Sequence, residues 1–538
     1  MIRSRTRSAI HSGMVAAITL ALVALPGDRE APSASPDVIS GPYARLLTES
    51  ADLGPAGSGS VQLTAALLER SEPVRLSAWA HEHGLSVRWP DGEDWAVIEG
   101  SPATVADAFG IPVHDYRIQF GADSGRVFYA SPEQPGIPSA ARAELAGLGR
   151  ILSYTPIREA LPPPPREVPN GGLLPDQLLN TYNATPLVAK GNTGQGQTVA
   201  VFAFDGFRQD DLDAFADMVH LPRFTPEVIG GVPERIGGEA NMDLQVIHAV
   251  APSAKLVLVN ARPTTNNEGG GAFEKLARLM DSVDNQFRGA VWSFSIGWGC
   301  DRLFTAADFA PVRSALARAL RHGTTAFDAS GDLAGLECKA GRKWSEPPSP
   351  DDVGVDAVGS LPEMTAVGGT KLSTGPNGEW HAEQAWYNGP LVQGTAGGAS
   401  TLFGRPEWQS VGVGTALPNQ RLVPDVSAVS DPFTGVRIVL NQRVMVGGGT
   451  SQAAPIWAGL AALMNQSLVR DGSKPLGNLN PLLYKVAKTA ILPGFHDINL
   501  GGNAIMPSST NGYDMVTGLG SPNIANLVRD IQLLRAVS

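Results

Sequence analysis

The chain has 538 residues, of which 43% are hydrophobic and 17% charged, and its formal net charge is −11. This composition excludes a disordered chain, and the acidic balance argues against nucleic acid or an anionic membrane surface as a partner. The length allows about two to four domains.

The first residues carry the pattern of an export signal. Arg3, Arg5 and Arg7 precede an apolar run of 13 residues at 13–25. A membrane-spanning helix needs about 20 apolar residues, so a signal peptide is favoured over a membrane anchor. We therefore expect residues 1–35 to be a signal peptide and flexible segment, and the protein to be secreted without stable membrane association.

A small α+β domain of the ferredoxin-like kind is expected at residues 36–160. Its pattern predicts helices at 61–70 (VQLTAALLER) and 102–110 (PATVADAFG) and strands at 85–89 (LSVRW) and 95–100 (WAVIEG). Four consecutive prolines then begin at Pro162. They indicate an extended linker over 161–175, where a protease could cut.

The remaining residues, 176–538, alternate buried-strand and helix patterns. Strands are predicted within 197–207, 255–261, 289–299 and 324–332, and helices within 210–220, 271–283 and 310–323. Such alternation predicts an α/β fold with a parallel sheet and helices on both faces. A site in such a sheet lies at the carboxyl ends of the strands.

Ser451 is a candidate nucleophile. It follows three glycines and opens an apolar helical pattern, in which Pro455 is tolerable if it lies in the first turn. A serine at a helix N-terminus lies beside unpaired N–H groups, which suit a nucleophile and an oxyanion. The alternative is a glycine-rich turn with Thr450 or Ser451 as a capping residue.

Three carboxyl groups are candidates to work with Ser451. Glu239 and Asp243 are four positions apart, so on a helix they share a face, where two close carboxyls would share a proton. The alternative is a solvated helix end. Asp332 follows a predicted strand and is either a turn aspartate or a protonated acid that donates to an oxyanion. His248 lies five positions after Asp243, away from that face, and is predicted to be a surface or packing residue.

Two cysteines, Cys300 and Cys338, are present. In an exported protein they can form a disulfide, and two buried free thiols are the alternative. Two cysteines without a nearby histidine pair argue against zinc.

These motifs together resemble the sedolisin family of serine-carboxyl peptidases, which have a subtilisin-like fold. The similar segments are GGEANMD (237–243), SGD (330–332) and GTSQAAP (449–455), with QTVAVF, MTAVGGT and VPDVSAVSDPFTG between and around them. The segment VIEGSPATVADAFGIPVHDY is similar to the activation pro-domain of that family. The chain departs from the family pattern at Gly297, where a serine is common.

The resemblance implies a secreted, acid-acting peptidase made as a self-processing zymogen. Ser451 would be the nucleophile, Glu239 its base, Asp243 the partner of that base and Asp332 the oxyanion donor. The implied partners are a protein or peptide substrate and the chain's own pro-domain as an intramolecular inhibitor. Both endopeptidases and tripeptidyl-peptidases occur in the family, and we expect a monomer.

The resemblance also implies one Ca²⁺ site near the C-terminus. Its ligands would be Asp497, Ile498, Thr510, Gly512 and Asp514, through two carboxylates and three main-chain carbonyls. Oxygen-only ligation suits calcium. Cys300 and Cys338 each follow a strand, and the two strands should be neighbours, which favours the disulfide.

Two other interpretations stay open at this point. One is a secreted calcium-binding homologue that has lost catalysis, although all four implied catalytic residues are present. The other is a histidine-based hydrolase of the subtilisin kind, which lacks a histidine in a suitable setting.

Overall fold

The computed structural model describes residues 37–57, 59–121, 123–156, 158–159, 171–262, 271–339, 347–389, 392–410, 413, 417–506 and 509–536. All described residues belong to one compact unit, Pro36–Ser538. The predicted signal peptide and residues 161–170 of the predicted linker lie outside the described residues. No described helix is long and apolar enough to cross a membrane.

The segment before residue 150 builds two small antiparallel sheets. The first has the strand order β3 (Ser86–Arg88), β4 (Trp95–Gly100), β2 (Val61–Leu67) and β7 (Leu145–Leu148). The second has the order β1 (Ala51–Pro55), β5 (His114–Arg117) and β6 (Val127–Ala130). Helices of this segment are α1 (Pro42–Thr48), α2 (Val74–Glu82) and α3 (Pro102–Phe109). The predicted strands at β3 and β4 and the predicted helix at α3 are therefore confirmed.

The helix predicted for 61–70 is wrong, because this segment forms strand β2. Its buried residues alternate strictly with half-buried ones, and β2 pairs on both sides with β4 and β7. Leucine and alanine favour helices in isolation, but this alternation places Val61, Leu63 and Leu67 on one buried face. Tertiary pairing has overridden local propensity here.

The second half of the chain is built on an eight-stranded sheet. The strand order is β10 (Glu227–Ile229), β11 (Lys255–Asn260), β9 (Thr198–Ala203), β12 (Val291–Phe294), β14 (Thr325–Ala329), β15 (Thr365–Thr374) and β16 (Trp380–Ala385), with β21 (Val426–Val429) also paired to β15. All pairs are parallel except β15–β16. The predicted α/β class is confirmed.

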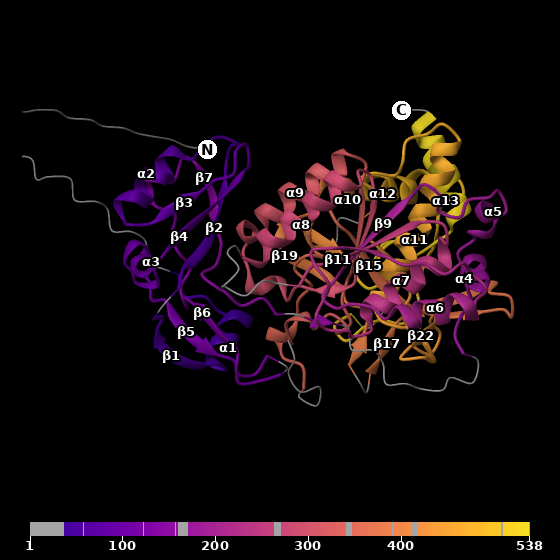
Figure 1. Cartoon of the computed structure of the whole chain (residues 1–538), viewed down its shortest axis with the longest axis horizontal. Helices are drawn as coiled ribbons and strands as arrows, with labels where there is room; N and C mark the ends of the chain where they lie inside the picture. The colour runs from indigo at the N-terminus through magenta and orange to yellow at the C-terminus, as the bar shows by residue number, and fades with distance from the viewer. Residues whose placement is uncertain are drawn as a thin grey trace, which may run out of the picture. The chain divides into compact units, whose positions relative to one another are not determined.

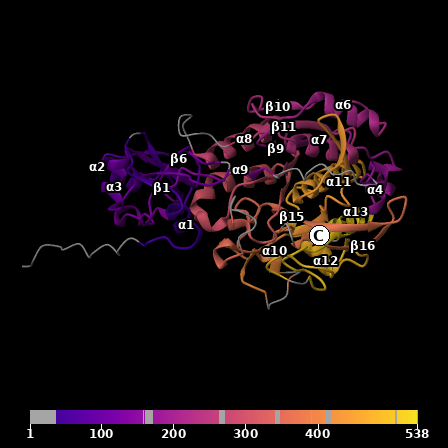
Figure 2. The same ribbon diagram turned by 90° about the horizontal axis from the view of Figure 1, so that it is seen from below.

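Helices cover both faces of this sheet, as Figures 1 and 2 show. One face of β9 presents Val199 and Val201 to a core that includes α7 (Glu239–Val250) and α11 (Thr450–Arg470). The other face presents Ala200 and Phe202 to a core that includes α8 (Ala272–Gln286) and α9 (Ala310–Arg321). A strand buried on both faces reads as a continuous apolar run, which is why β9 was predictable.

Further helices and strand pairs complete this part of the chain. The helices are α4 (Pro175–Thr181), α5 (Thr185–Val188), α6 (Gln209–Met218), α10 (Glu407–Ser410), α12 (Asn480–Thr489) and α13 (Ile524–Ala536). Two-stranded pairs are β17 (Tyr387–Asn388) with β18 (Gln393–Gly394), β19 (Gly398–Gly404) with β20 (Gln420–Val423), β22 (Arg437–Leu440) with β23 (Arg443–Val446), and β24 (Phe495–His496) with β25 (Ser521–Pro522).

Candidate active site

Helix α7 holds Glu239 and Asp243 on one buried face. Glu239 is the first residue of the helix and Asp243 lies one turn later. The exposed fraction is 5% for Glu239 and 0% for Asp243. The alternative of a solvated helix end is therefore wrong.

The environment of this pair favours protonation. Burial raises the pKa of Glu239 well above its usual value, and the charges of Asp243, Asp205 and Asp332 raise it further, while the Ser451 hydroxyl lowers it. Burial also raises the pKa of Asp243, and the Asp205 charge adds to this, while the side chains of Ser295 and Glu239 lower it.

The two carboxyl groups have few partners in their immediate surroundings. Among the described residues, no donor forms a well-aligned hydrogen bond with Glu239 Oε1 or with either oxygen of Asp243. Two buried carboxyls at close range avoid double ionisation, so one shared proton is the arrangement that this surrounding favours.

Ser451 lies at the start of α11, opposite the carbonyl end of β12. The helix begins after Gly449, whose φ is 84°, and Pro455 lies in its second turn rather than its first. Pro455 has no N–H, so the carbonyl of Ser451 lacks its usual intrahelical donor. Ser295 Oγ donates to that carbonyl at 3.0 Å, and Ser451 Oγ donates to the carbonyl of Ser295 at 3.3 Å.

Asp332 is joined to the residue before the candidate nucleophile. Thr450 donates to Asp332 Oδ1 from its backbone N–H at 2.7 Å and from its hydroxyl at 2.8 Å. A Cβ on Gly449 would lie 2.7 Å from Asp332 Oδ2, so only glycine permits this approach. The loop after β14 and the start of α11 therefore form one unit.

The structure thus brings all four predicted residues to one place. The charges of Asp243 and Asp332 raise the pKa of Glu239, and the Ser451 hydroxyl lowers it. Ser295, at the end of β12, and Asp332, after β14, lie beyond carboxyl ends of neighbouring strands, where a site is expected.

Asp205, which follows β9, was not predicted as a site residue from the sequence. Its Oδ2 accepts the backbone N–H groups of Gly237, Gly238 and Glu239 at 2.9, 2.7 and 3.2 Å. Its Oδ1 accepts the N–H of Ala240 at 3.1 Å. The only sequence signal was an aspartate at the carboxyl end of a predicted strand.

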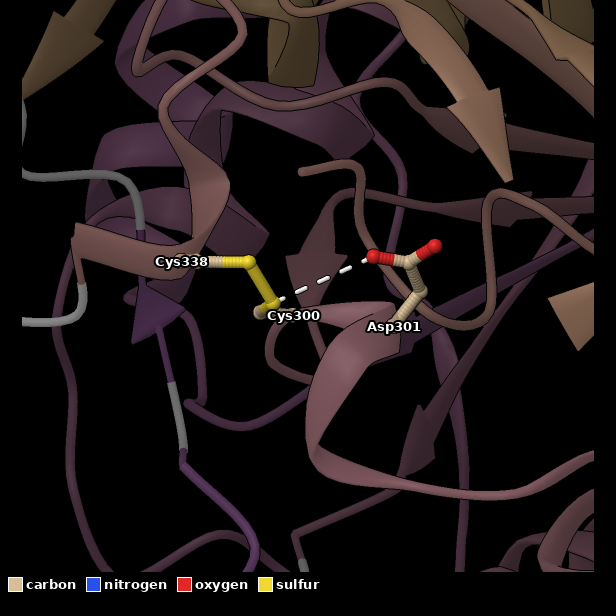
Figure 3. A group of neighbouring side chains, drawn as sticks. All are labelled: Cys300, Asp301 and Cys338. Carbon is tan, nitrogen blue, oxygen red and sulfur yellow. Dashed lines mark hydrogen bonds between the residues drawn. A yellow bond between two sulfur atoms is a disulfide. The ribbon is translucent and has the colours of Figure 1, made fainter. Parts of the chain in front are cut away.

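Cys300 and Cys338 form a disulfide with a Cα–Cα distance of 4.8 Å (Figure 3), so the favoured pairing is confirmed. Asp301 lies beside it and accepts the backbone N–H of Thr401 at 2.7 Å. Both sulfurs are bonded to each other, so this cluster offers no thiolate to a metal. Glu337, next to Cys338, accepts the N–H of Leu333, so the disulfide is adjacent to the loop that carries Asp332.

The five predicted calcium ligands lie in two adjoining loops. The N–H of Gly512 donates to Asp497 at 3.0 Å, and the N–H of Thr510 donates to Asp514 at 3.0 Å. Thr517 Oγ1 contacts both the carbonyl of Ile498 at 3.4 Å and Asp514 Oδ1 at 3.3 Å. Within the described part of the chain, neither carboxylate is paired with a cationic side chain. An all-oxygen set of this charge fits calcium.

His248 is a buried packing residue. Its ring stacks on Phe224 with centroids 4.0 Å apart, and its Nε2 lies 2.8 Å from the carbonyl of Pro222. Burial lowers its pKa to about 4. No contact joins it to Ser451 among those described, as predicted for a packing residue.

The N-terminal segment contacts the strand beside Ser451. β8 (Arg158–Glu159) pairs antiparallel with β13 (Ile296–Gly297), directly after Ser295. A Cβ on Gly299 would lie 2.9 Å from Pro156, so the chain runs closely over this strand. Three ion pairs join the N-terminal segment to other parts of the chain: Arg88–Glu274 at 2.7 Å, Glu93–Arg318 at 2.5 Å and Arg45–Asp352 at 2.9 Å.

Comparison with known proteins gives consistent relatives, although no family model matches the chain. Kumamolisin of Bacillus sp. (strain MN-32) is 30% identical over 354 residues, which cover 62% of this chain and 59% of kumamolisin. Tripeptidyl-peptidase 1 of Homo sapiens is 26% identical, covering 78% of this chain and 76% of the relative. The solved structure of Pseudomonas sedolisin, a serine-carboxyl proteinase complexed with two molecules of pseudo-iodotyrostatin, is similar with a TM-score of 0.58 and 27% identity, covering 67% of this chain and 98% of that one.

Proposed function

Because this chain belongs to the sedolisin family, we propose that it is a serine-carboxyl peptidase that hydrolyses peptide bonds in acid. One observation carries the proposal: two buried carboxyls without a cationic partner among the described residues lie beside a helix-terminal serine. Burial of such a pair costs folding free energy, and a catalytic role would explain why the pair is present.

The reaction begins when Ser451 Oγ attacks the peptide carbonyl carbon. Its proton passes to Glu239, and the same proton then passes to the leaving amine as the C–N bond breaks. Water repeats the sequence on the acyl-enzyme, which releases the acid product and restores the serine hydroxyl. Asp243 shares a proton with Glu239 and keeps its carboxyl oriented toward Ser451.

The developing oxyanion is held by two donors. One is Asp332, which would donate once substrate has bound and it has taken up a proton in acid; two hydrogen bonds from Thr450 fix its orientation. The other is the N–H of Ser451, in the first helical turn, where the helix supplies no acceptor. Loss of one such donor commonly costs about 3 kcal/mol of transition-state stabilisation.

The substrate is a peptide that binds as an extended strand along Ile296 and Gly297. Support comes from β8, since the chain's own backbone already pairs with β13 there. The N-terminal segment, residues 36–160, is accordingly an intramolecular inhibitor, and cleavage within 161–175 would remove it. The protein is made with a signal peptide and flexible segment within 1–35, is secreted and acts as a monomer.

Calcium stabilises the C-terminal loops in this proposal. Asp497 and Asp514 would bind it through carboxylates, and Ile498, Thr510 and Gly512 through main-chain carbonyls. A bound ion would supply positive charge to two carboxylates that otherwise accept only backbone and hydroxyl donors among the described residues.

The decisive experiment compares purified wild type with Ser451→Ala at about pH 4, the range in which a carboxyl base works. The substrate library contains blocked peptides and peptides with free N-termini, which separates endopeptidase from tripeptidyl-peptidase products. We expect wild type to cleave peptides and to shorten itself, and Ser451→Ala to do neither. An intact, calcium-binding wild type without cleavage would instead indicate a non-catalytic homologue.

A further inference from the structure

Asp205 holds the N-terminal turn of the helix that carries both carboxyl groups of the pair. Its two oxygens accept four consecutive backbone N–H groups, those of residues 237–240, at 2.7 to 3.2 Å. The first N–H groups of a helix have no partner inside the helix, so Asp205 satisfies the turn that begins at Glu239. Asp205 itself is fully buried.

Asp205 is distant in the sequence from the four residues whose N–H groups it accepts. Asp205 follows β9, so the sheet fixes its position independently of α7. A Cβ on Gly237 would lie only 2.5 Å from Asp205 Oδ2, so the loop before α7 is shaped around this carboxylate. The direction in which Glu239 leaves the helix start is therefore set by the sheet.

We propose that Asp205 is a positioning residue that fixes the first turn of α7 and thereby the placement of the Glu239 and Asp243 carboxyl groups. The inference rests on the proposed peptidase function. The negative charge of Asp205 favours retention of the shared proton by the pair, in the same direction as burial. Asp205 thus adds to burial and Asp243 in raising the pH at which Glu239 becomes available as a base.

Other charged groups around α7 are accounted for. Asp243, on the same helix, and Asp332, after β14, also raise the proton affinity of Glu239. On the elements packed against α7, Asp211 of α6 accepts from the turn between β22 and β23, and Arg437 of β22 donates to the carbonyl of Gly171. The further charged side chains on these elements are Asp176, Asp210, Asp213, Asp217 and Arg470.

Asp211 is a matched control for Asp205. It is likewise fully buried, and it accepts the backbone N–H groups of Asn441 and Gln442 at 2.9 and 2.8 Å. It packs near α7 through Asn241, with 3.5 Å between Asn241 Nδ2 and Asp211 Oδ2. Asp211 is not among the charges that act on Glu239 or Asp243.

The test measures kcat/KM against pH for wild type, Asp205→Asn and Asp211→Asn. Removal of the Asp205 charge lowers the pH at which the pair releases its proton. We expect the acid limb of the Asp205→Asn profile to move down by roughly one pH unit, and kcat to fall because Asn cannot accept four N–H donors. Asp211→Asn should keep the wild-type limb.

Hydrogen exchange of the amides at 237–240 gives a second readout. Asp205→Asn should lose protection there, and Asp211→Asn should not. If Asp205→Asn does not fold, Gly237→Ala replaces it. Gly237 lies in a half-buried loop, and a methyl group there would come within 2.5 Å of Asp205 Oδ2 and push the carboxylate away from the N–H groups. Gly237→Ala should also move the acid limb to lower pH and reduce the exchange protection of the amides at 237–240.

The outcomes separate the two proposals. An active wild type and an inactive Ser451→Ala, with Asp205→Asn and Gly237→Ala both keeping the wild-type limb, would overturn the role of Asp205 alone. Peptidase activity that survives in Ser451→Ala, or no activity in wild type, would overturn the function itself. Exchange protection at 237–240 would still report on the cap in that case.

Discussion

Two buried acidic sites in this protein differ in how their charge is satisfied. Asp425 is fully buried, but Arg421 donates to both of its oxygens, Tyr484 donates to Oδ1 at 2.8 Å, and the N–H of Ala366 donates to Oδ2 at 2.8 Å. Glu239 and Asp243 are buried to a similar degree, yet no described cationic group pairs with them. In the proposed mechanism, the state of their partners rather than burial separates Glu239 and Asp243 from the ion-paired Asp425.

The largest expected effect is on the rate after Glu239→Gln. Loss of the base should reduce kcat/KM by roughly a thousandfold or more, with no loss of thermal stability near neutral pH, since an unpaired buried acid has been removed. Peptide cleavage assays and thermal unfolding measure the two quantities.

The matched control for this variant is Glu383→Gln. Glu383 is buried but accepts from Thr370 at 2.7 Å and from Trp380 at 2.9 Å, so its replacement should cost stability and leave the rate unchanged. The comparison fails if Glu239→Gln unfolds while Glu383→Gln loses activity at unchanged stability.

Asp425→Ala should have the next largest effect, this time on folding. It leaves the Arg421 guanidinium buried without its partner, which typically costs about 3–5 kcal/mol of unfolding free energy. Denaturant unfolding at constant pH measures this. The double variant Arg421→Met with Asp425→Leu should lose much less, because no charge is left unpaired; a double variant as unstable as the single one would contradict this account.

A third pair, Asp497 and Asp514, sharpens the comparison because its proposed partner is an ion. A chelator should lower the unfolding free energy by about 2.7 kcal/mol relative to calcium at one hundred times its dissociation constant. Asp514→Asn should abolish the difference, whereas Asp91→Asn, at an exposed turn, should preserve it. Equal melting temperatures with and without calcium in the wild type would remove the proposed site.

The smallest effect concerns stability against pH. Burial raises the folded-state pKa of both Glu239 and Asp243, so the folded protein holds protons that the unfolded chain releases. The stability of the wild type should therefore fall as pH rises from the ordinary carboxyl range through the raised values. Glu239→Gln with Asp243→Asn should lack this fall and be more stable than wild type near neutral pH. Parallel stability curves would show that the pair is not protonated in the fold.

Much of this molecule could be predicted from local patterns. Strands β9, β11, β12 and β14 are continuous apolar runs, and the proximity of Glu239 and Asp243 follows from helical spacing alone. Strand β2 was mistaken for a helix because its apolar residues also have high helix propensity. The meeting of Asp332 with Thr450 rested on the family resemblance, since residues 118 positions apart leave no periodic signal.

Asp205 marks the limit of such prediction. Its four donors lie 32 to 35 positions later, in a loop and a helix start without any pattern that points back to it. Capping by the neighbouring residue is visible in a sequence, whereas capping from another strand requires the fold.

The exchange of hydrogen bonds between Ser295 and Ser451 has a mechanical consequence. Pro455 leaves the Ser451 carbonyl without its helical donor, so this carbonyl can accept from Ser295. The two hydrogen bonds between Ser295 and Ser451 join the end of β12 to the start of α11. Ile296 and Gly297, where a backbone already docks, are the next residues along the chain. Under the proposed function, a peptide aligned on them would lie in fixed register with the serine hydroxyl, so its distance in residues along that edge would select the bond to be cut.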